Sequence, residues 1–155
     1  MEKILLTFGT RPFAQRLGNM LSSQYTCYYG SSEPFPDLLL RQRYSRIPTA
    51  ANPVFVHEVL KTCLDKGCTF VLPLGETELG PLAEARVLFE EYGIAVLVPQ
   101  DWEHMAVLSD PRADVDVRIL RGGIDMITGR SAAADGFSGV VVLSDSEEEL
   151  AICVV

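Results

Sequence analysis

Apolar residues gather along the first hundred positions in short runs, separated by stretches with helical spacing. The runs lie at residues 4–8, 25–29, 69–72 and 94–98, and a shorter segment at 44–48 ends at a proline. A run without polar alternation is typical of a strand covered on both faces of a parallel sheet. Between the runs, apolar residues recur every three to four positions, as on one side of an amphipathic helix. The pattern predicts five strands connected largely by helices.

The segment from Gly67 to Pro99 organises this pattern, because it predicts a complete strand, helix and strand. The strand at 69–72 stops at Pro73, and the helix that follows from about Leu79 is ended by Gly93. Such a unit has a right-handed crossover and a parallel second strand. With the three earlier strands, it predicts a doubly wound α/β fold whose sheet has the order 3-2-1-4-5.

The pattern changes after Pro99. Residues 101–108 predict one more short helix, and from Asp114 the apolar positions alternate with polar ones around a Gly122-Gly123 turn. Residues 140–143 and 150–155 predict two further strands around an acidic segment at 145–149, and residues 132–136 predict a mobile loop. We therefore expect a Rossmann-like domain at 1–100, a connector at 101–113 and a small antiparallel β subdomain at 114–155.

The net charge limits the classes of binding partner, and the cysteine content indicates the cellular compartment. The 155 residues carry a formal net charge of -8 without a dense cluster of lysine and arginine, which argues against nucleic acid and anionic membranes. A small molecule or another protein is favoured. No apolar run approaches about 20 residues and no leader precedes the first strand, which predicts neither a membrane span nor secretion. The 4 cysteines lack CxxC spacing, which predicts reduced thiols in a cytoplasmic protein.

Polar residues follow the first and fourth predicted strands, and they are the candidate binding residues. Ligands of open parallel sheets bind outside the carboxyl ends of the strands. The candidates in the two loops are Gly9, Thr10, Arg11, Gly75, Glu76, Thr77 and Glu78. The arginine fork suits a carboxylate or phosphate, and the glutamates suit an amine or a general base. The alternatives are that both glutamates stabilise a helix N-terminus and that Arg11 forms an ordinary ion pair.

The sequence predicts no cofactor and no metal. A dinucleotide loop needs several glycines in G-x-G-x-x-G spacing, whereas the first strand is followed by Gly9 alone. An adenosine-binding unit also places an acidic residue at the end of the second strand, where this chain has Gly30. His57 and His104 have no partner at metal or nucleophile spacing. We name no catalytic residue.

The order of several segments resembles the pre-ATP-grasp domain of carbamoyl-phosphate-synthase-like ATP-grasp ligases. These segments are Arg43–Pro48, Val71–Leu79, Glu91–Ile94 and Val96–Pro99. The resemblance implies a Rossmann-like sheet that helps to bind an acid or amine substrate rather than ATP. Residues 114–155 are similar to a late piece of the ATP-grasp fold itself. The lysine-bearing lid that this family places between the two pieces has no counterpart here.

Two functions are consistent with this resemblance. The first is a non-catalytic small-molecule-binding or regulatory module derived from an ATP-grasp carboxylate-amine ligase, with an amino acid or carboxylate as ligand. The second is the substrate-binding part of a split ligase that an ATP-grasp partner chain completes. The apolar segment Leu150–Val155 is either an interior strand or a surface that a second subunit covers, because an edge strand facing water should carry charge or proline. Of these alternatives we expect the second, a homodimer whose contact includes Ile152 and Val154.

Overall fold

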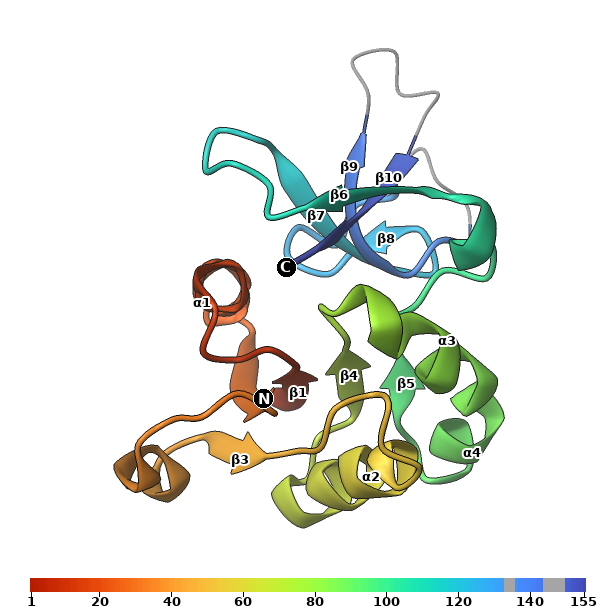
Figure 1. Ribbon diagram of the computed structural model, residues 1–155. Helices are drawn as coiled ribbons and strands as arrows, with labels where there is room; N and C mark the ends of the chain where they lie inside the picture. Colours follow the sequence, from red (N-terminus) through yellow and green to blue (C-terminus); the bar gives the residue numbers. More distant parts are fainter. Residues whose placement is uncertain (133–135, 144–149) are drawn as a thin grey trace.

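The computed structural model describes residues 1–132, 136–143 and 150–155. Two five-stranded sheets form its framework, and Figure 1 shows them one above the other. The acidic segment at 145–149 and positions 133–135 of the predicted loop lie outside the described residues. Within the described ranges, no helix has the length and apolar content that crossing a membrane requires.

The first sheet, called the parallel sheet here, contains only parallel strands in the order β3-β2-β1-β4-β5. This confirms the predicted α/β class and strand order. The strands are β1 (Glu2–Leu6), β2 (Tyr25–Ser31), β3 (Tyr44–Arg46), β4 (Phe70–Leu72) and β5 (Ala95–Val96). The apolar runs predicted these strands because both faces of the sheet are covered, so that β4 and the last three residues of β1 are buried.

Helices cover the two faces of the parallel sheet unequally. Helix α1 (Pro12–Leu21) packs against the face that carries Ile4 and Leu6. The opposite face is covered by α2 (Phe55–Lys66), α3 (Glu76–Glu84) and α4 (Arg86–Glu91). The predicted helix from Leu79 to Tyr92 is therefore two helices, and the first begins three residues earlier. The earlier start follows from a capping arrangement at Gly75, described below.

The second sheet, called the mixed sheet, has the order β6-β10-β9-β7-β8. Its strands are β6 (Ala106–Ser109), β7 (Val117–Arg121), β8 (Ile124–Asp125), β9 (Gly139–Leu143) and β10 (Leu150–Val154). Gly122 and Gly123 have φ values of 56° and 83°, so the predicted turn between β7 and β8 is confirmed. The pairs among β7, β8, β9 and β10 are antiparallel, whereas β6 is parallel to β10.

The helix predicted at 101–108 is wrong. Only Trp102–His104 forms a short 3-10 helix, and the next residues form strand β6. The segment is too short to bury an amphipathic helical face, whereas pairing with buried β10 satisfies the backbone groups on one side of the segment. The predicted connector therefore supplies a strand of the mixed sheet.

The mixed sheet covers the part of the α1-bearing face that α1 leaves open (Figure 1). Its residues Val117 and Ile119 belong to the same core cluster as Phe70 and Leu72 of β4. Burying this much apolar surface is the main force that holds the two sheets together.

Strand β10 lies inside the mixed sheet, between β6 and β9. Ile152 and Val154 are 3% and 1% exposed, so their own chain buries them. The interior-strand alternative is confirmed, and a dimer contact through these two side chains is wrong because neither reaches the surface. Whether the chain dimerises elsewhere stays a prediction.

Candidate functional site

The two loops predicted to bind a ligand lie side by side at the carboxyl end of the parallel sheet. They follow β1 and β4, which are neighbours in the sheet. The Leu74 amide donates a hydrogen bond to the Thr7 hydroxyl at 2.7 Å, which ties the two strand ends together. The adjacency of the two loops follows from the confirmed strand order, in which β1 and β4 are neighbours.

Glu78 is buried between these loops and is only 3% exposed. Its Oε1 atom accepts hydrogen bonds from the Thr7 hydroxyl at 2.5 Å and from the Gly75 amide at 3.0 Å. Burial raises the pKa of the Glu78 carboxyl to about 7, against the effect of these hydrogen bonds. This is the helix-terminus alternative, in which the carboxyl group caps α3 and joins two loops. Glu76 and Thr77, beside it, are exposed.

Arg11 forms an ion pair at the same end of the sheet. Its Nε and Nη2 atoms donate to the two carboxylate oxygens of Glu33 at 2.7 and 2.9 Å. The hydrogen bond from Arg11 holds the pKa of Glu33 below its usual range. Both atoms of the fork that a ligand carboxylate would use are therefore occupied by the protein's own carboxylate.

Phe8, in the loop after β1, packs against Gly75 in the loop after β4, a contact that no local sequence pattern predicts. It has a φ of 50°, a conformation that bulky residues seldom adopt. Its ring lies against Gly75, where a Cβ atom would come within 2.3 Å of Phe8 Cε2. The Arg11 guanidinium lies 5.9 Å from the centre of the same ring. Gly9, in turn, lies so close to Tyr29 that a Cβ atom there would be 2.4 Å from Tyr29 Cβ.

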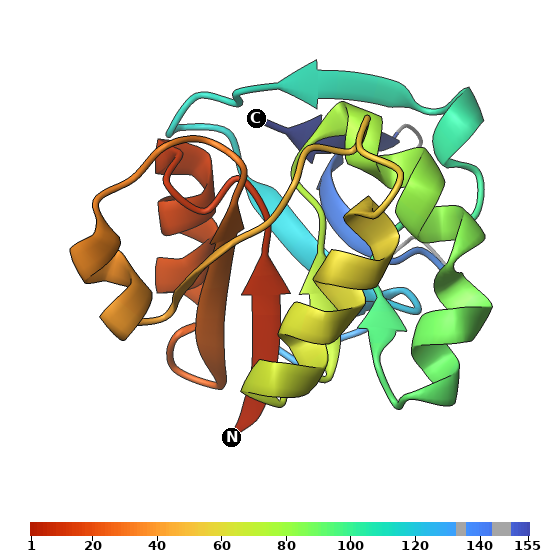
Figure 2. The ribbon, with the colours of Figure 1, turned by 60° about the horizontal axis from the view of Figure 1, so that its bottom comes forward.

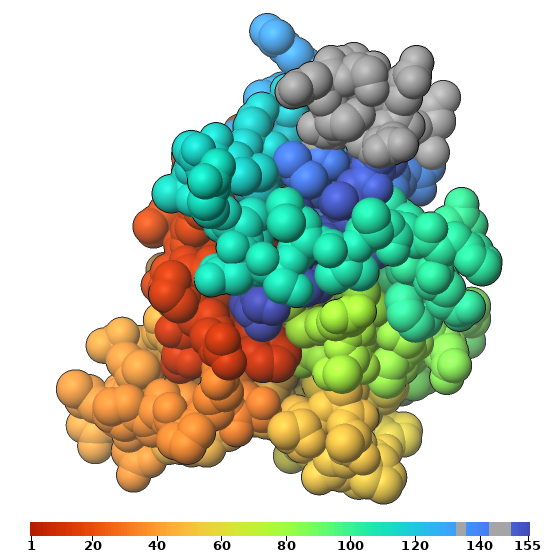
Figure 3. All heavy atoms as spheres, turned by 45° about the horizontal axis from the view of Figure 1, so that its top comes forward, coloured from red at the N-terminus to blue at the C-terminus, as the bar shows by residue number. Residues whose placement is uncertain are grey.

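The mixed sheet also reaches this end of the parallel sheet. The Val155 amide donates to the Leu74 carbonyl at 2.9 Å, directly after β4. Figure 3 shows this part of the chain (dark blue) between the red amino-terminal segment and the lime segment that includes α3. The predicted site residues are thus brought to one end of the sheet, but Glu78, Arg11 and Gly75 are each engaged by neighbouring groups of the protein.

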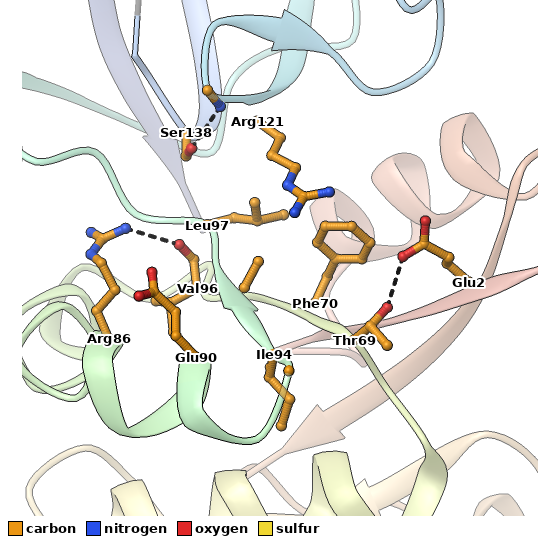
Figure 4. A pocket seen from close by; sticks show the side chains of 13 residues that line it. Glu2, Thr69, Phe70, Arg86, Glu90, Ile94, Val96, Leu97, Arg121 and Ser138 are labelled. Atoms are coloured by element: carbon orange, nitrogen blue, oxygen red, sulfur yellow. Dashed lines mark hydrogen bonds between the residues drawn. The ribbon is translucent and has the colours of Figure 1, made fainter.

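A cavity of about 550 Å³ lies elsewhere, between the parallel sheet and the turn that joins β7 to β8 (Figure 4). Its apolar lining includes Phe70, Ile94, Val96 and Leu97, and its polar lining includes Arg86, Glu90, Arg121, Ser138, Glu2 and Thr69. The volume falls within the range of small-molecule sites, and the lining combines apolar side chains with a similar share of polar groups.

Arg121 extends into this cavity from the carboxyl end of β7 (Figure 4). Its guanidinium lies over the Phe70 ring, 4.9 Å from the ring centre, in the geometry of a cation–π contact. Among the described residues, Arg121 forms no ion pair. The Ser138 hydroxyl oxygen accepts from the Gly122 amide at 2.9 Å, so its hydrogen is left to donate.

Arg86 approaches the cavity from α4. Its Nη1 and Nη2 atoms donate to the Val96 and Val98 carbonyls at 3.1 and 2.6 Å, along the outer edge of β5. Burial lowers the pKa of Arg86, while Glu90, one turn further along the helix, acts in the opposite direction. The described part of the chain provides no ion-pair partner for Arg86 within 4.0 Å.

The sequence did not reveal this cavity. Arg121 precedes a glycine turn and Arg86 lies on an amphipathic helix, and both contexts are typical of surface residues. The cavity exists only because the turn of the mixed sheet packs near Phe70, which is far away in sequence. Nor do the described residues bring three or more metal-ligating side chains together.

The sequence matches no protein-family model, and a search of curated proteins gives no significant match. The α/β fold therefore rests on the structure, and the relationship to ATP-grasp ligases remains a hypothesis.

Proposed function

We propose that the protein is a non-catalytic small-molecule-binding module, and that its ligand is an amino acid or a related carboxylate bound between the two sheets. The observation that carries the proposal is Arg121, a guanidinium that lines a cavity of about 550 Å³ and has no carboxylate partner among the described residues. A guanidinium binds carboxylates through two parallel hydrogen bonds.

The surroundings of Arg121 support a ligand with both an acidic and an apolar part. The Arg121 guanidinium lies over the Phe70 ring, and the Ser138 hydroxyl supplies a further donor in the lining of the same cavity. Ile94 and Leu97 provide an apolar wall, which suits an aliphatic or aromatic side chain. Glu90 and Glu2 also line the cavity and carry the charge that an ammonium group requires.

The ancestry that we propose is loss of function from an ATP-grasp carboxylate-amine ligase. Two features support it: the order β3-β2-β1-β4-β5, and the strand, turn and strand of β7 and β8 that follow. A regulatory role in the cytoplasm fits the 4 cysteines, all of which are free and buried. The same β7–β8 hairpin favours the alternative, a substrate-binding part of a split ligase completed by an ATP-grasp partner chain.

The binding experiment is isothermal titration calorimetry with L-leucine, L-phenylalanine and L-glutamate, each compared with its α-carboxamide. We expect at least one free acid to bind and its amide to bind at least about tenfold more weakly, because the amide lacks the carboxylate. Arg121→Gln should remove this preference. Arg118→Gln is the matched control, since Arg118 lies on the same strand in an exposed ion pair with Asp116 at 3.7 Å.

Two results would contradict the proposal. One is the absence of binding by all three acids at millimolar concentration. The other is equal affinity of the wild type and Arg121→Gln for a ligand that binds. Both functions leave ATP binding outside this chain, since the alternative assigns it to the partner chain. Titration of the isolated chain with ATP and magnesium should therefore show no micromolar affinity, because the chain has neither a glycine-rich phosphate loop nor a lysine-bearing lid. Micromolar affinity would contradict both functions.

A further inference from the structure

The two sheets have four edge strands, and three of these edges are blocked. At β5, Arg86 donates to the Val96 and Val98 carbonyls along the outer edge. At β8, Ile124 bridges to Ser131, and the Asp125 amide donates to the Arg130 carbonyl. Charged residues, short length and covering loops are the usual ways to keep a sheet edge from pairing with another chain.

The third blocked edge is β3. It is only three residues long and carries the charged side chain of Arg46, which pairs with Asp37 at 2.5 Å. Pro48 follows two residues after the strand. A second chain could therefore form only a few backbone hydrogen bonds with β3, and it would meet a charged side chain there.

The fourth edge, β6, is also short, with four residues, and Pro111 follows two residues after it, but its span carries no charge and no described loop or side chain bonds to its outer edge. Its sequence Ala106-Val107-Leu108-Ser109 contains no charge and no proline. It pairs with β10 on one side, while Figure 2 shows it (teal) along the border of the molecule on the other. Ala106, Val107 and Ser109 are exposed.

The register identifies which backbone groups of β6 remain unpaired. The Asp110 amide donates to the Val154 carbonyl at 2.8 Å, so Leu108, two residues earlier, also directs its amide and carbonyl toward β10. Val107 and Ser109 direct theirs away from the sheet. Neither residue has a side-chain, turn or loop hydrogen bond among the described residues. Two donors and two acceptors are thus presented in the geometry of a strand.

We infer that β6 pairs antiparallel with β6 of a second copy of this chain, about a two-fold axis at Leu108. In this register Val107 of each copy lies opposite Ser109 of the other, so all four outward groups gain partners. A register centred on Val107 would instead place Ser109 opposite Met105, whose amide already donates to the Trp102 carbonyl. Self-complementarity of this kind is what a two-fold interface requires.

Electrostatics sets the conditions for this association. The paired residues 106–109 are uncharged, so no like charges face one another within the ladder. Each copy has a net charge of -8, however, and the two copies repel at longer range. Association should therefore strengthen as salt is added, because counterions screen this repulsion.

The test combines sedimentation velocity with amide hydrogen exchange across a range of protein concentrations. We expect a dimer that forms at micromolar to millimolar concentration and more readily at high salt. The amides of Val107 and Ser109 should become protected as the dimer forms, whereas that of Leu108 should be protected at every concentration. Val107→Lys should weaken dimerisation at least about tenfold, because edge lysines block strand pairing.

Two further variants make the test specific. Ile124→Lys places the same charge on an exposed residue of the β8 edge, 49% exposed, and should leave dimerisation unchanged. Ser109→Pro removes one outward donor and should also weaken the dimer, which covers the case that Val107→Lys misfolds. The inference is overturned by a monomer at all concentrations and salts. It is equally overturned by a dimer in which Val107 and Ser109 exchange rapidly, or by pairing of β6 with a different polypeptide only.

Discussion

Two arginines near different ends of the parallel sheet have opposite surroundings. Arg11 lies at the carboxyl end, where topology predicts a ligand, and both oxygens of Glu33 occupy its fork. Arg121 lines the cavity beside Thr69 and Ile94, next to the start of β4 and β5, and has no carboxylate partner among the described residues. The strand topology predicts where a binding site can form. Whether a charged side chain there is available to a ligand depends on whether the protein's own groups already pair with it.

The buried carboxyl of Glu78 sharpens this comparison. At the carboxyl end the polar groups bind one another and hold two loops of the protein together. In the cavity, the polar side chains line an open volume (Figure 4). Substitutions at the carboxyl end should therefore affect stability, and substitutions in the cavity should affect binding.

The largest expected effect is that of Glu78→Ala on stability. The change leaves the Thr7 hydroxyl and the Gly75 amide without their acceptor and removes the cap of α3. We expect the free energy of unfolding to fall by about 2 to 4 kcal/mol at pH 6. Urea denaturation measures it. Glu76→Ala, at an exposed position in the same turn, should change stability by less than about 0.5 kcal/mol, and equal effects would show that Glu78 is not structural.

The second prediction concerns pH. The pKa of Glu78 is raised from 4.5 to about 7 in the folded protein, so the folded state holds the proton more tightly than the unfolded state. This contribution to stability is fully present below the unfolded pKa of 4.5 and is lost as pH rises through about 7.

Between pH 5 and pH 8 the wild type should lose about 2 kcal/mol of stability relative to Glu78→Gln, which keeps the Oε1 acceptor but cannot ionise. Denaturation curves of both proteins across this range provide the measurement. If the two lose stability in parallel, the Glu78 carboxyl is not held in a pKa-raising environment.

The smallest expected effect is that of Arg11→Gln. The Arg11–Glu33 pair is exposed, and exposed pairs contribute little to stability. Ligand affinity should stay unchanged, because this fork is engaged by Glu33 rather than by ligand. Calorimetry with the amino acids named above measures the affinity of Arg11→Gln. A loss of about tenfold would indicate that the ligand binds at the carboxyl end of the sheet instead.

Much of the fold could be predicted from local patterns. Buried parallel strands leave uninterrupted apolar runs, and the Gly122-Gly123 turn requires positive φ values that glycine adopts without strain. Strand β6 could not be predicted, because a short segment around Ala-Val-Leu fits a helix turn or a strand equally well. Its pairing with β10, more than forty residues later, decided the outcome.

The candidate site was less predictable than the fold. Stabilisation of a helix N-terminus was one of the alternatives for Glu78 because the residue immediately precedes the predicted helix, but its capping bond to the Gly75 amide was not predicted. Its burial, which raises its pKa, and its hydrogen bond from Thr7, 71 positions earlier in the chain, depend on tertiary packing and have no local signal. The sequence around Arg121 does not predict a binding residue. Its candidate role depends on its contact with the distant Phe70 ring and on the absence of an ion-pair partner among the described residues.

The most direct test of the central claim is NMR of the arginine Nε–H groups during titration with the tightest-binding amino acid. Each arginine reports separately, so the two ends of the sheet are compared in one experiment. The account predicts that the Arg121 signal shifts and saturates with the ligand, while the Arg11 signal, held by Glu33, stays in place. A shift at Arg11 with none at Arg121 would contradict it.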